Sequence, residues 1–187
     1  VGVTNQSVKG KTLLLKSVPA DSVYKIMMKE SDNFIAEHLL LQCADMVSDT
    51  LQPEIAIAYV QQKLLHDLPD RLVWVDGSGL SRYNLVTPRS IVDVWKKIYR
   101  MVPQQRLFHL LASGGGHGTL KNYFKNDQPY IFGKTGTLSN NHALSGYLLT
   151  KKGNLYIFAY MNSHYVSSTK DVRLAMESFL NTIYEQR

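Results

Sequence analysis

The chain has 187 residues, of which 44% are hydrophobic, 10% aromatic and 19% charged, and these fractions exclude collagen, coiled-coil and disordered classes. The longest apolar runs are far shorter than the roughly 20 residues of a membrane span, so we expect no span in this chain. A single cysteine, Cys43, excludes an internal disulfide scaffold and any multi-cysteine metal site. The net charge of +6 comes from scattered basic residues, which favours a solvated surface over a nucleic-acid interface.

The beginning of the chain predicts a strand followed by a short helix. Val1 is preceded by neither a methionine nor a signal peptide, so we expect a processed chain or an excised piece of a longer protein. The first fifteen residues alternate loosely, which predicts a strand that ends at Thr12–Leu15. Proline and aspartate in Ser17–Asp21 are typical of a helix start, and the helix should end near Glu30.

Further helices are predicted between residues 34 and 111. An apolar stripe with a period of 3.6 residues predicts a helix over Phe34–Cys43, with Cys43 as a core thiol. Glycines and Pro88 predict a loop over residues 76–90, and a second, flexible loop follows at Gly114–Gly118. The other helices are expected over 53–65, 91–101 and 104–111.

The last third of the chain changes character. Residues 130–137, 143–150 and 155–162 predict three strands, with a hairpin turn at Lys151–Asn154. An amphipathic helix is predicted over 169–184. Helices, then a three-stranded antiparallel meander, then a covering helix together indicate an α+β fold.

Two short motifs carry chemistry. Ser31-Asp32-Asn33 lies between two predicted helices, and Lys134-Thr135-Gly136-Thr137 lies in a predicted strand. Each is weak alone, but with a Ser-x-x-Lys element they form the signature of penicillin-binding proteins and class A β-lactamases. Acyl transfer by serine needs a base, a proton relay to the leaving amine and donors for the oxyanion. Hydroxyl, amide and ammonium groups in these motifs can supply such functions.

The chain resembles the C-terminal part of DacB-type, class C low-molecular-mass penicillin-binding proteins, which are D-alanyl-D-alanine carboxypeptidases and endopeptidases. The resemblance implies a partial β-lactamase/transpeptidase-like fold, with residues 1–187 as the C-terminal part of a serine transpeptidase-like domain. Five ordered segments from about residue 17 onward carry it: Lys29–Glu37, Asp76–Asn84, Gly118–Leu120, Gly133–Leu138 and Ala143–Tyr147.

The resemblance implies roles for three catalytic residues. Ser31 would lie in the proton relay, and Asn33 would contact the substrate amide. Lys134 would shape the electrostatics near the nucleophile.

The resemblance also implies a substrate-binding set. Thr135 and Thr137 would bind the terminal carboxylate, and the backbone N–H of Thr137 would be one oxyanion donor. Gly136 would let the substrate backbone lie against the strand. Arg82 is a weaker candidate for binding the peptide stem.

The nucleophile is expected outside this chain. Ser22-Val23-Tyr24-Lys25 matches Ser-x-x-Lys, but Ser22 lies nine positions before Ser31, or roughly 13 Å along a helix axis. Both hydroxyls would have to reach one reacting centre, so we reject this match. The resemblance places the nucleophile far upstream, before an inserted domain, and we expect the chain to be inactive by itself.

Plainer interpretations stand beside these. Ser31-Asp32-Asn33 could cap the following helix, because all three residue types favour caps. The motif around Lys134 could be an ordinary strand edge, and the loop from Asp76 to Arg82 is more readily structural than catalytic. The six histidines show no metal-ligand spacing with a carboxylate, so we expect most of them at the surface or in loops.

The sequence thus predicts part of a serine-type D-alanyl-D-alanine carboxypeptidase or endopeptidase that acts on peptidoglycan stem peptides through an acyl-serine, without metal or cofactor. β-Lactams would inhibit the parent enzyme, the upstream half of the same domain would be a partner, and the location would be the periplasm or cell envelope. The alternative is a non-catalytic peptidoglycan-binding or scaffold module that has lost the nucleophile.

Overall fold

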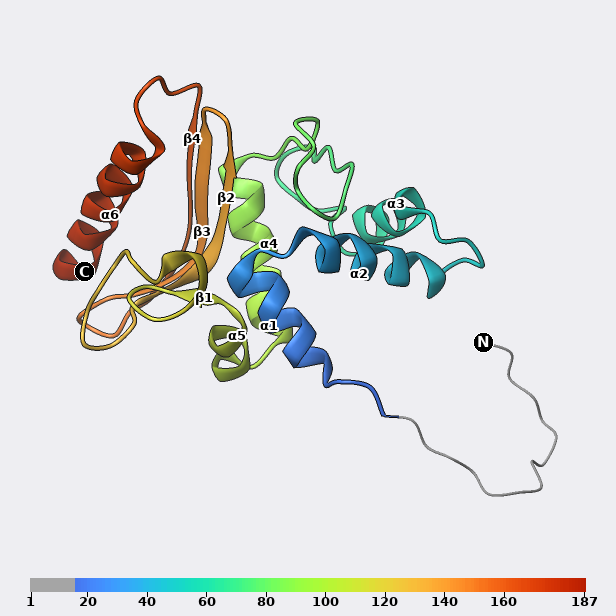
Figure 1. Ribbon diagram of the computed structural model, residues 1–187, viewed down its shortest axis with the longest axis horizontal. Coiled ribbons are helices and arrows are strands. Elements are labelled where there is room, and N and C mark those ends of the chain that lie inside the picture. Colours follow the sequence, from blue (N-terminus) through green and yellow to red (C-terminus); the bar gives the residue numbers. More distant parts are fainter. Residues whose placement is uncertain (1–15) are drawn as a thin grey trace.

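The computed structural model describes residues 16–187, so the strand expected at Thr12–Leu15 lies outside the described residues. Helices come first, an antiparallel sheet follows, and a last helix covers the sheet (Figure 1). This order confirms the α+β prediction. The helices are α1 (Ala20–Glu30), α2 (Asn33–Asp45), α3 (Pro53–Lys63), α4 (Pro88–Met101), α5 (Gln104–Leu110), the 3₁₀ helix η1 (Gly118–Leu120) and α6 (Thr169–Gln186); the strands are β1 (Ala112–Ser113), β2 (Ile131–Leu138), β3 (Asn141–Leu149) and β4 (Leu155–Ser163).

The sheet has the strand order β1-β2-β3-β4, so the three predicted strands form the expected meander. The two-residue β1 was not predicted, because Ala112 and Ser113 stand between a helix and a glycine loop and are too short to show a period. β1 pairs only with Phe132 and Gly133 of β2. In the described part of the chain, β2 therefore has an open edge from Lys134 onward.

Two other predictions need correction. Helix α4 begins at Pro88, inside the segment predicted to be a loop, because Pro fits the first helical turn and Thr87 accepts a hydrogen bond from the backbone N–H of Ser90. Cys43 is exposed rather than a core thiol. Helix α2 packs on α3 through Leu40 and Ala44, which leaves Cys43 on the outer side.

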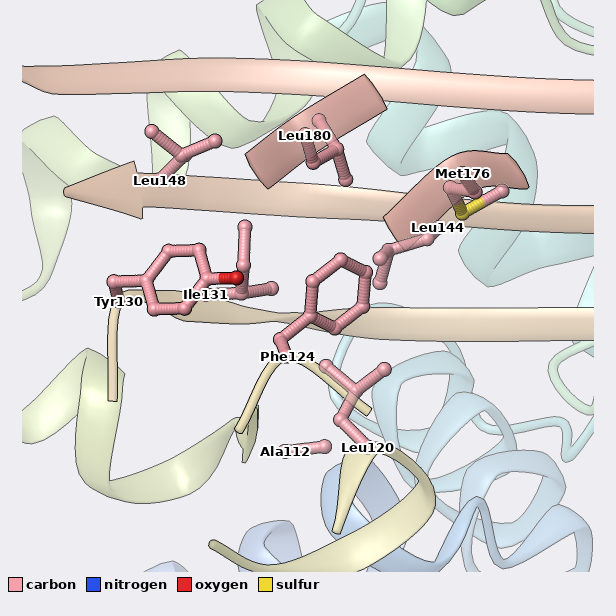
Figure 2. Packing of buried hydrophobic residues seen from close by; sticks show 9 residues of the cluster. All are labelled: Ala112, Leu120, Phe124, Tyr130, Ile131, Leu144, Leu148, Met176 and Leu180. Atoms are coloured by element: carbon pink, nitrogen blue, oxygen red, sulfur yellow. The ribbon is translucent and has the colours of Figure 1, made fainter. Parts of the chain in front are cut away.

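Alternating side chains give β2 two different faces. Ile131 faces α6 and joins one apolar core, whereas Phe132 stacks on Phe108 of α5 on the other side of the sheet. Figure 2 shows the first core, in which Met176 and Leu180 of α6 lie over the sheet. Its buried members are Ala112, Leu120, Phe124, Tyr130, Ile131, Leu144, Leu148, Met176 and Leu180. The odd-numbered side chains of β2 thus belong to the α6 side, and the even-numbered ones to the helical side.

The second core holds α4 and α5 against the sheet. Trp95 donates its indole N–H to Ser145 Oγ at 2.9 Å, and the hydroxyl of Tyr147 donates to the carbonyl of Trp95 at 2.8 Å. Tyr147 is completely buried, as sheet packing requires. These bonds satisfy the polar ends of two large aromatic side chains whose rings supply the apolar contact.

Helices α2 and α3 lie away from the sheet and have only a small core of their own (Figure 1). Between α3, residues 64–86 and α4 is a largely apolar groove of about 750 Å³. Several of the apolar side chains that line it are exposed, among them Leu64, Leu85 and Met101. This groove therefore leaves apolar side chains of the described residues uncovered.

Among residues 16–187, no helix is both long enough and apolar enough to cross a membrane.

Candidate active site

Ser31 occupies a sharp corner between two helices. It follows the last residue of α1 in the left-handed backbone region, with φ 60° and ψ 48°, which non-glycine residues rarely adopt. Asp32 then caps α2 by accepting a hydrogen bond from the backbone N–H of Ile35 at 2.8 Å. Asn33 begins α2 and is exposed. Capping by Asp32 leaves the side chains of Ser31 and Asn33 free of that task.

Lys134 reaches this corner from the sheet. Its Nζ donates to Ser31 Oγ at 2.6 Å and to the carbonyl oxygen of Thr135 at 2.7 Å. Burial lowers the pKa of Lys134 to about 8, because desolvation disfavours the charged amine. Ser31 and Lys134 are 103 residues apart in the sequence, and the fold thus brings the two motifs into direct contact.

The open edge of β2 carries backbone groups as well. On the β1 side of β2, the Gly114 N–H donates to the carbonyl oxygen of Ile131. On the β3 side, the Leu149 N–H donates to the carbonyl oxygen of Tyr130. Because backbone groups alternate in direction along an antiparallel strand, the N–H of Thr137 points to the open edge. A Cβ built at Gly136 meets no described atom within 4 Å, so the face of the strand beside Lys134 is open there.

Two threonine hydroxyls meet on the α6 side of β2. Thr135 Oγ1 lies 2.8 Å from Thr119 Oγ1. Thr119 belongs to η1, which begins at Gly118 with φ 72°. A Cβ at Gly118 would come within 2.5 Å of the carbonyl oxygen of Lys29, so glycine lets this turn pack against the end of α1.

Sequence reasoning missed two residues beside Thr137. His142 Nδ1 lies 2.8 Å from Thr137 Oγ1, and Arg173 Nη2 of α6 lies 3.5 Å from the same oxygen. His142 is only 3% exposed, so it is an exception to the expectation that most of the histidines lie at the surface or in loops. Its partner across β2–β3 is Thr137, and a strand period running through residues 141–149 would have placed it inward. No short motif pointed to Arg173.

Hydrogen bonds to two carboxylates hold the backbone of the loop at 76–84. Asp76 accepts backbone hydrogen bonds from Gly79 at 2.7 Å and from Ser81 at 2.8 Å. Glu37 Oε2 of α2 accepts from the backbone N–H groups of Gly77 and Ser78, at 2.8 and 3.0 Å. These contacts support the structural interpretation of Asp76 and attach the loop to the helix that follows Ser31.

Arg82 extends from that loop toward the sheet. Its Nη2 donates to the carbonyl oxygen of Ser139, in the turn after β2, at 3.3 Å, and its side chain is exposed. Arg82 therefore lies near the far end of the open edge, at a distance from the Ser31–Lys134 contact along the strand. Ser22 is exposed on the first turn of α1, at the opposite end of that helix from Ser31.

Two curated relatives match large parts of the chain. Penicillin-sensitive carboxypeptidase A of Dictyostelium discoideum is 34% identical over 128 residues, covering 64% of this chain and 24% of that protein. D-alanyl-D-alanine carboxypeptidase DacB of Haemophilus influenzae is 26% identical over 181 residues, covering 91% of this chain and 38% of that protein. The chain thus spans between a quarter and two fifths of the length of these relatives.

Solved structures agree in fold. Penicillin-binding protein 4 (DacB) of Haemophilus influenzae, in complex with a β-lactam, has a TM-score of 0.77 at 25% identity and covers 90% of this chain and 42% of that one. The TLA-1 extended-spectrum β-lactamase shares the fold with a TM-score of 0.64 at 14% identity, covering 88% of this chain and 62% of that one. These matches confirm the expected β-lactamase/transpeptidase-like fold.

A family model described as the D-Ala-D-Ala carboxypeptidase 3 (S13) family matches residues 1–183. That range includes nearly the whole chain and both motifs, which the structure joins through Lys134 and Ser31. The chain belongs to the D-Ala-D-Ala carboxypeptidase 3 (S13) family.

Proposed function

We propose that this chain is the C-terminal part of the catalytic domain of a serine-type D-alanyl-D-alanine carboxypeptidase or endopeptidase that acts on peptidoglycan stem peptides in the cell envelope. The observation that carries the proposal is the 2.6 Å contact between Lys134 Nζ and Ser31 Oγ. The enzyme would form an acyl-serine, release the terminal D-alanine and then hydrolyse the acyl group, and β-lactams would acylate the same serine.

Ser31 and Lys134 would serve the proton transfers. As the nucleophilic serine attacks the scissile carbonyl, a proton must reach the amine that leaves. The hydroxyl of Ser31 can accept one proton and give up its own, so it can relay without changing its net charge. The Lys134 ammonium would hold that hydroxyl and favour the negative charge that develops at the reacting centre. Asn33 would bind the substrate amide from the first turn of α2.

The open edge of β2 would hold the substrate. An extended peptide adds to an exposed strand through backbone hydrogen bonds, and Gly136 leaves the space for it. The Thr137 N–H, which points to that edge, would donate to the oxyanion. The hydroxyls of Thr135 and Thr137 would bind the terminal carboxylate. Arg82 would contact the peptide stem at the far end.

The nucleophile would come from an upstream half of the same domain. Two observations support this part of the proposal: the chain covers 38% of the DacB relative, and the groove between α3 and α4 leaves apolar side chains exposed. Burial of apolar surface favours association by about 25 cal/mol per Å², so an upstream segment that covers the groove would stabilise the domain.

Release of D-alanine from a D-alanyl-D-alanine peptide by the full-length protein tests the proposal. We expect activity in the wild type and a loss of at least 100-fold in Ser31→Ala and Lys134→Ala. Ser167→Ala, in the exposed loop before α6, is the matched control and should retain full activity. A full-length protein that binds the peptide without releasing D-alanine would instead support the non-catalytic binding module.

A further inference from the structure

Arg173 places a positive charge beside the hydroxyl of Thr137. It lies in the first turns of α6, and its Nη2 is 3.5 Å from Thr137 Oγ1. Its guanidinium carbon lies 5.6 Å from the centroid of the Tyr123 ring, an arrangement that favours a cation over the ring face. The side chain is therefore held from two directions at the α6 side of the open edge.

This charge has no acidic partner in the described residues. The ion pairs of residues 16–187 use other arginines and lysines, namely Arg89, Lys97, Arg106 and Lys151. A guanidinium stays charged at any pH that a folded protein meets and can only donate hydrogen bonds. Arg173 is half-buried, so an anion that reached it would form a stronger contact than at a fully exposed arginine.

His142 limits what the Thr137 hydroxyl can do. Its Nδ1 lies 2.8 Å from Thr137 Oγ1, and its side chain is buried beneath α6. Burial, together with the nearby charge of Arg173, lowers the pKa of His142 to about 4, so the ring is neutral at neutral pH. A neutral ring that carries its proton on Nδ1 would donate to Thr137. With Arg173 as the second donor, both lone pairs of the hydroxyl would be occupied and its own proton left for an acceptor in solution.

The neighbouring hydroxyl of Thr135 is a weaker donor to a carboxylate than a guanidinium. Thr135 Oγ1 lies 2.8 Å from Thr119 Oγ1, and either hydroxyl of this pair can be the donor. When Thr119 donates, Thr135 keeps its own proton for the carboxylate. Of the groups named on this face of β2, Arg173 alone is charged, so its hydrogen bonds to a carboxylate are the strongest.

We propose that Arg173 and Thr137 together bind the terminal carboxylate of the substrate, and that Arg173 makes the enzyme select peptides with a free carboxylate. His142 would be a positioning residue that holds the Thr137 hydroxyl in its donating orientation. The inference rests on the proposed function, since it assigns the carboxylate subsite of the same active site.

The test compares two peptides in the full-length enzyme, one ending in D-alanyl-D-alanine and the other in its C-terminal amide. We expect the ratio of kcat/KM values, acid over amide, to fall by about 10- to 100-fold in Arg173→Gln, because a hydrogen bond to a charged group is lost. Arg173→Lys should keep part of the preference. Lys170→Gln, on the same helix and exposed, changes the net charge equally and should leave the ratio unchanged.

The outcomes separate the two proposals. A wild type that cleaves neither peptide would overturn the proposed function. A wild type that cleaves the acid, with an Arg173→Gln variant of unchanged ratio or equal losses on both peptides, would overturn the role of Arg173 alone. For His142, His142→Gln keeps a donor on its amide and should preserve the ratio, whereas His142→Leu should lower it; equal ratios in both variants would contradict the positioning role.

Discussion

The carboxylate of Glu37 joins α2 to the loop that carries Arg82. Its Oε2 accepts hydrogen bonds from two consecutive backbone N–H groups, at Gly77 and Ser78. Glu37 comes six residues after Ser31 and lies in α2, the helix that begins directly after the Ser31 corner, so the same helix adjoins the proposed relay serine and carries the anchor of the loop. The orientation of the loop is therefore coupled to the corner that holds Ser31.

Removal of that anchor should destabilise the fold. In Glu37→Ala, two backbone N–H groups lose a charged acceptor, and we expect the free energy of unfolding to fall by about 2 kcal/mol. Urea denaturation of the full-length protein measures this. Glu54→Ala, an exposed acidic residue in the first turn of α3, should change stability much less. Equal losses in the two variants would show that the Glu37 hydrogen bonds contribute nothing specific.

The open space next to the Cα of Gly136 gives a second prediction. A Cβ at this position meets no described atom, so Gly136→Ala should leave the thermal unfolding midpoint nearly unchanged. The added methyl group would occupy the face of β2 against which we place the substrate backbone, and acylation by penicillin should slow at least tenfold. Stopped-flow acylation and a thermal melt on the same sample measure both. An unchanged acylation rate would remove Gly136 from the binding site.

The pKa of Lys134 predicts how acylation depends on pH. Burial lowers that pKa to about 8, so the ammonium is lost as the pH rises through 8. If the positive charge is what assists the reaction, acylation by penicillin should decline with a midpoint near pH 8. A rate that rises through the same pH would mean that the neutral amine acts as a base, against the electrostatic role.

Much of the fold follows from local patterns, and the site only in part. Alternating hydrophobicity predicts the strands β2–β4, and helical periodicity predicts α6. The predicted bounds of these elements therefore agree closely with the structure over residues 130–184. Ser31 and Lys134 were found because short motifs mark them. Arg173 was missed because its relation to Thr137 depends on how α6 lies on the sheet, which no local pattern encodes. His142 lies one position before the predicted start of its strand, so the strand pattern did not predict that its side chain points inward.

Burial of His142 makes stability depend on pH. Its pKa is about 4 in the folded chain and near 6.5 when unfolded, so the unfolded state binds more protons between these values. Stability is therefore fully present above pH 6.5 and is lost as the pH falls toward 4, by at most about 3 kcal/mol. Urea denaturation at pH 7 and pH 4.5 should show a smaller difference in His142→Gln than in the wild type. An equal difference in both proteins would assign the effect to other groups.

The central claim is that Ser31 and Lys134 serve a nucleophile outside this chain. Its most direct test is peptide mapping of the acylated serine after full-length protein reacts with a fluorescent penicillin. We predict a single labelled serine, upstream of residue 1, in a Ser-x-x-Lys element. Label on Ser22, or on any other serine within residues 1–187, would contradict the account.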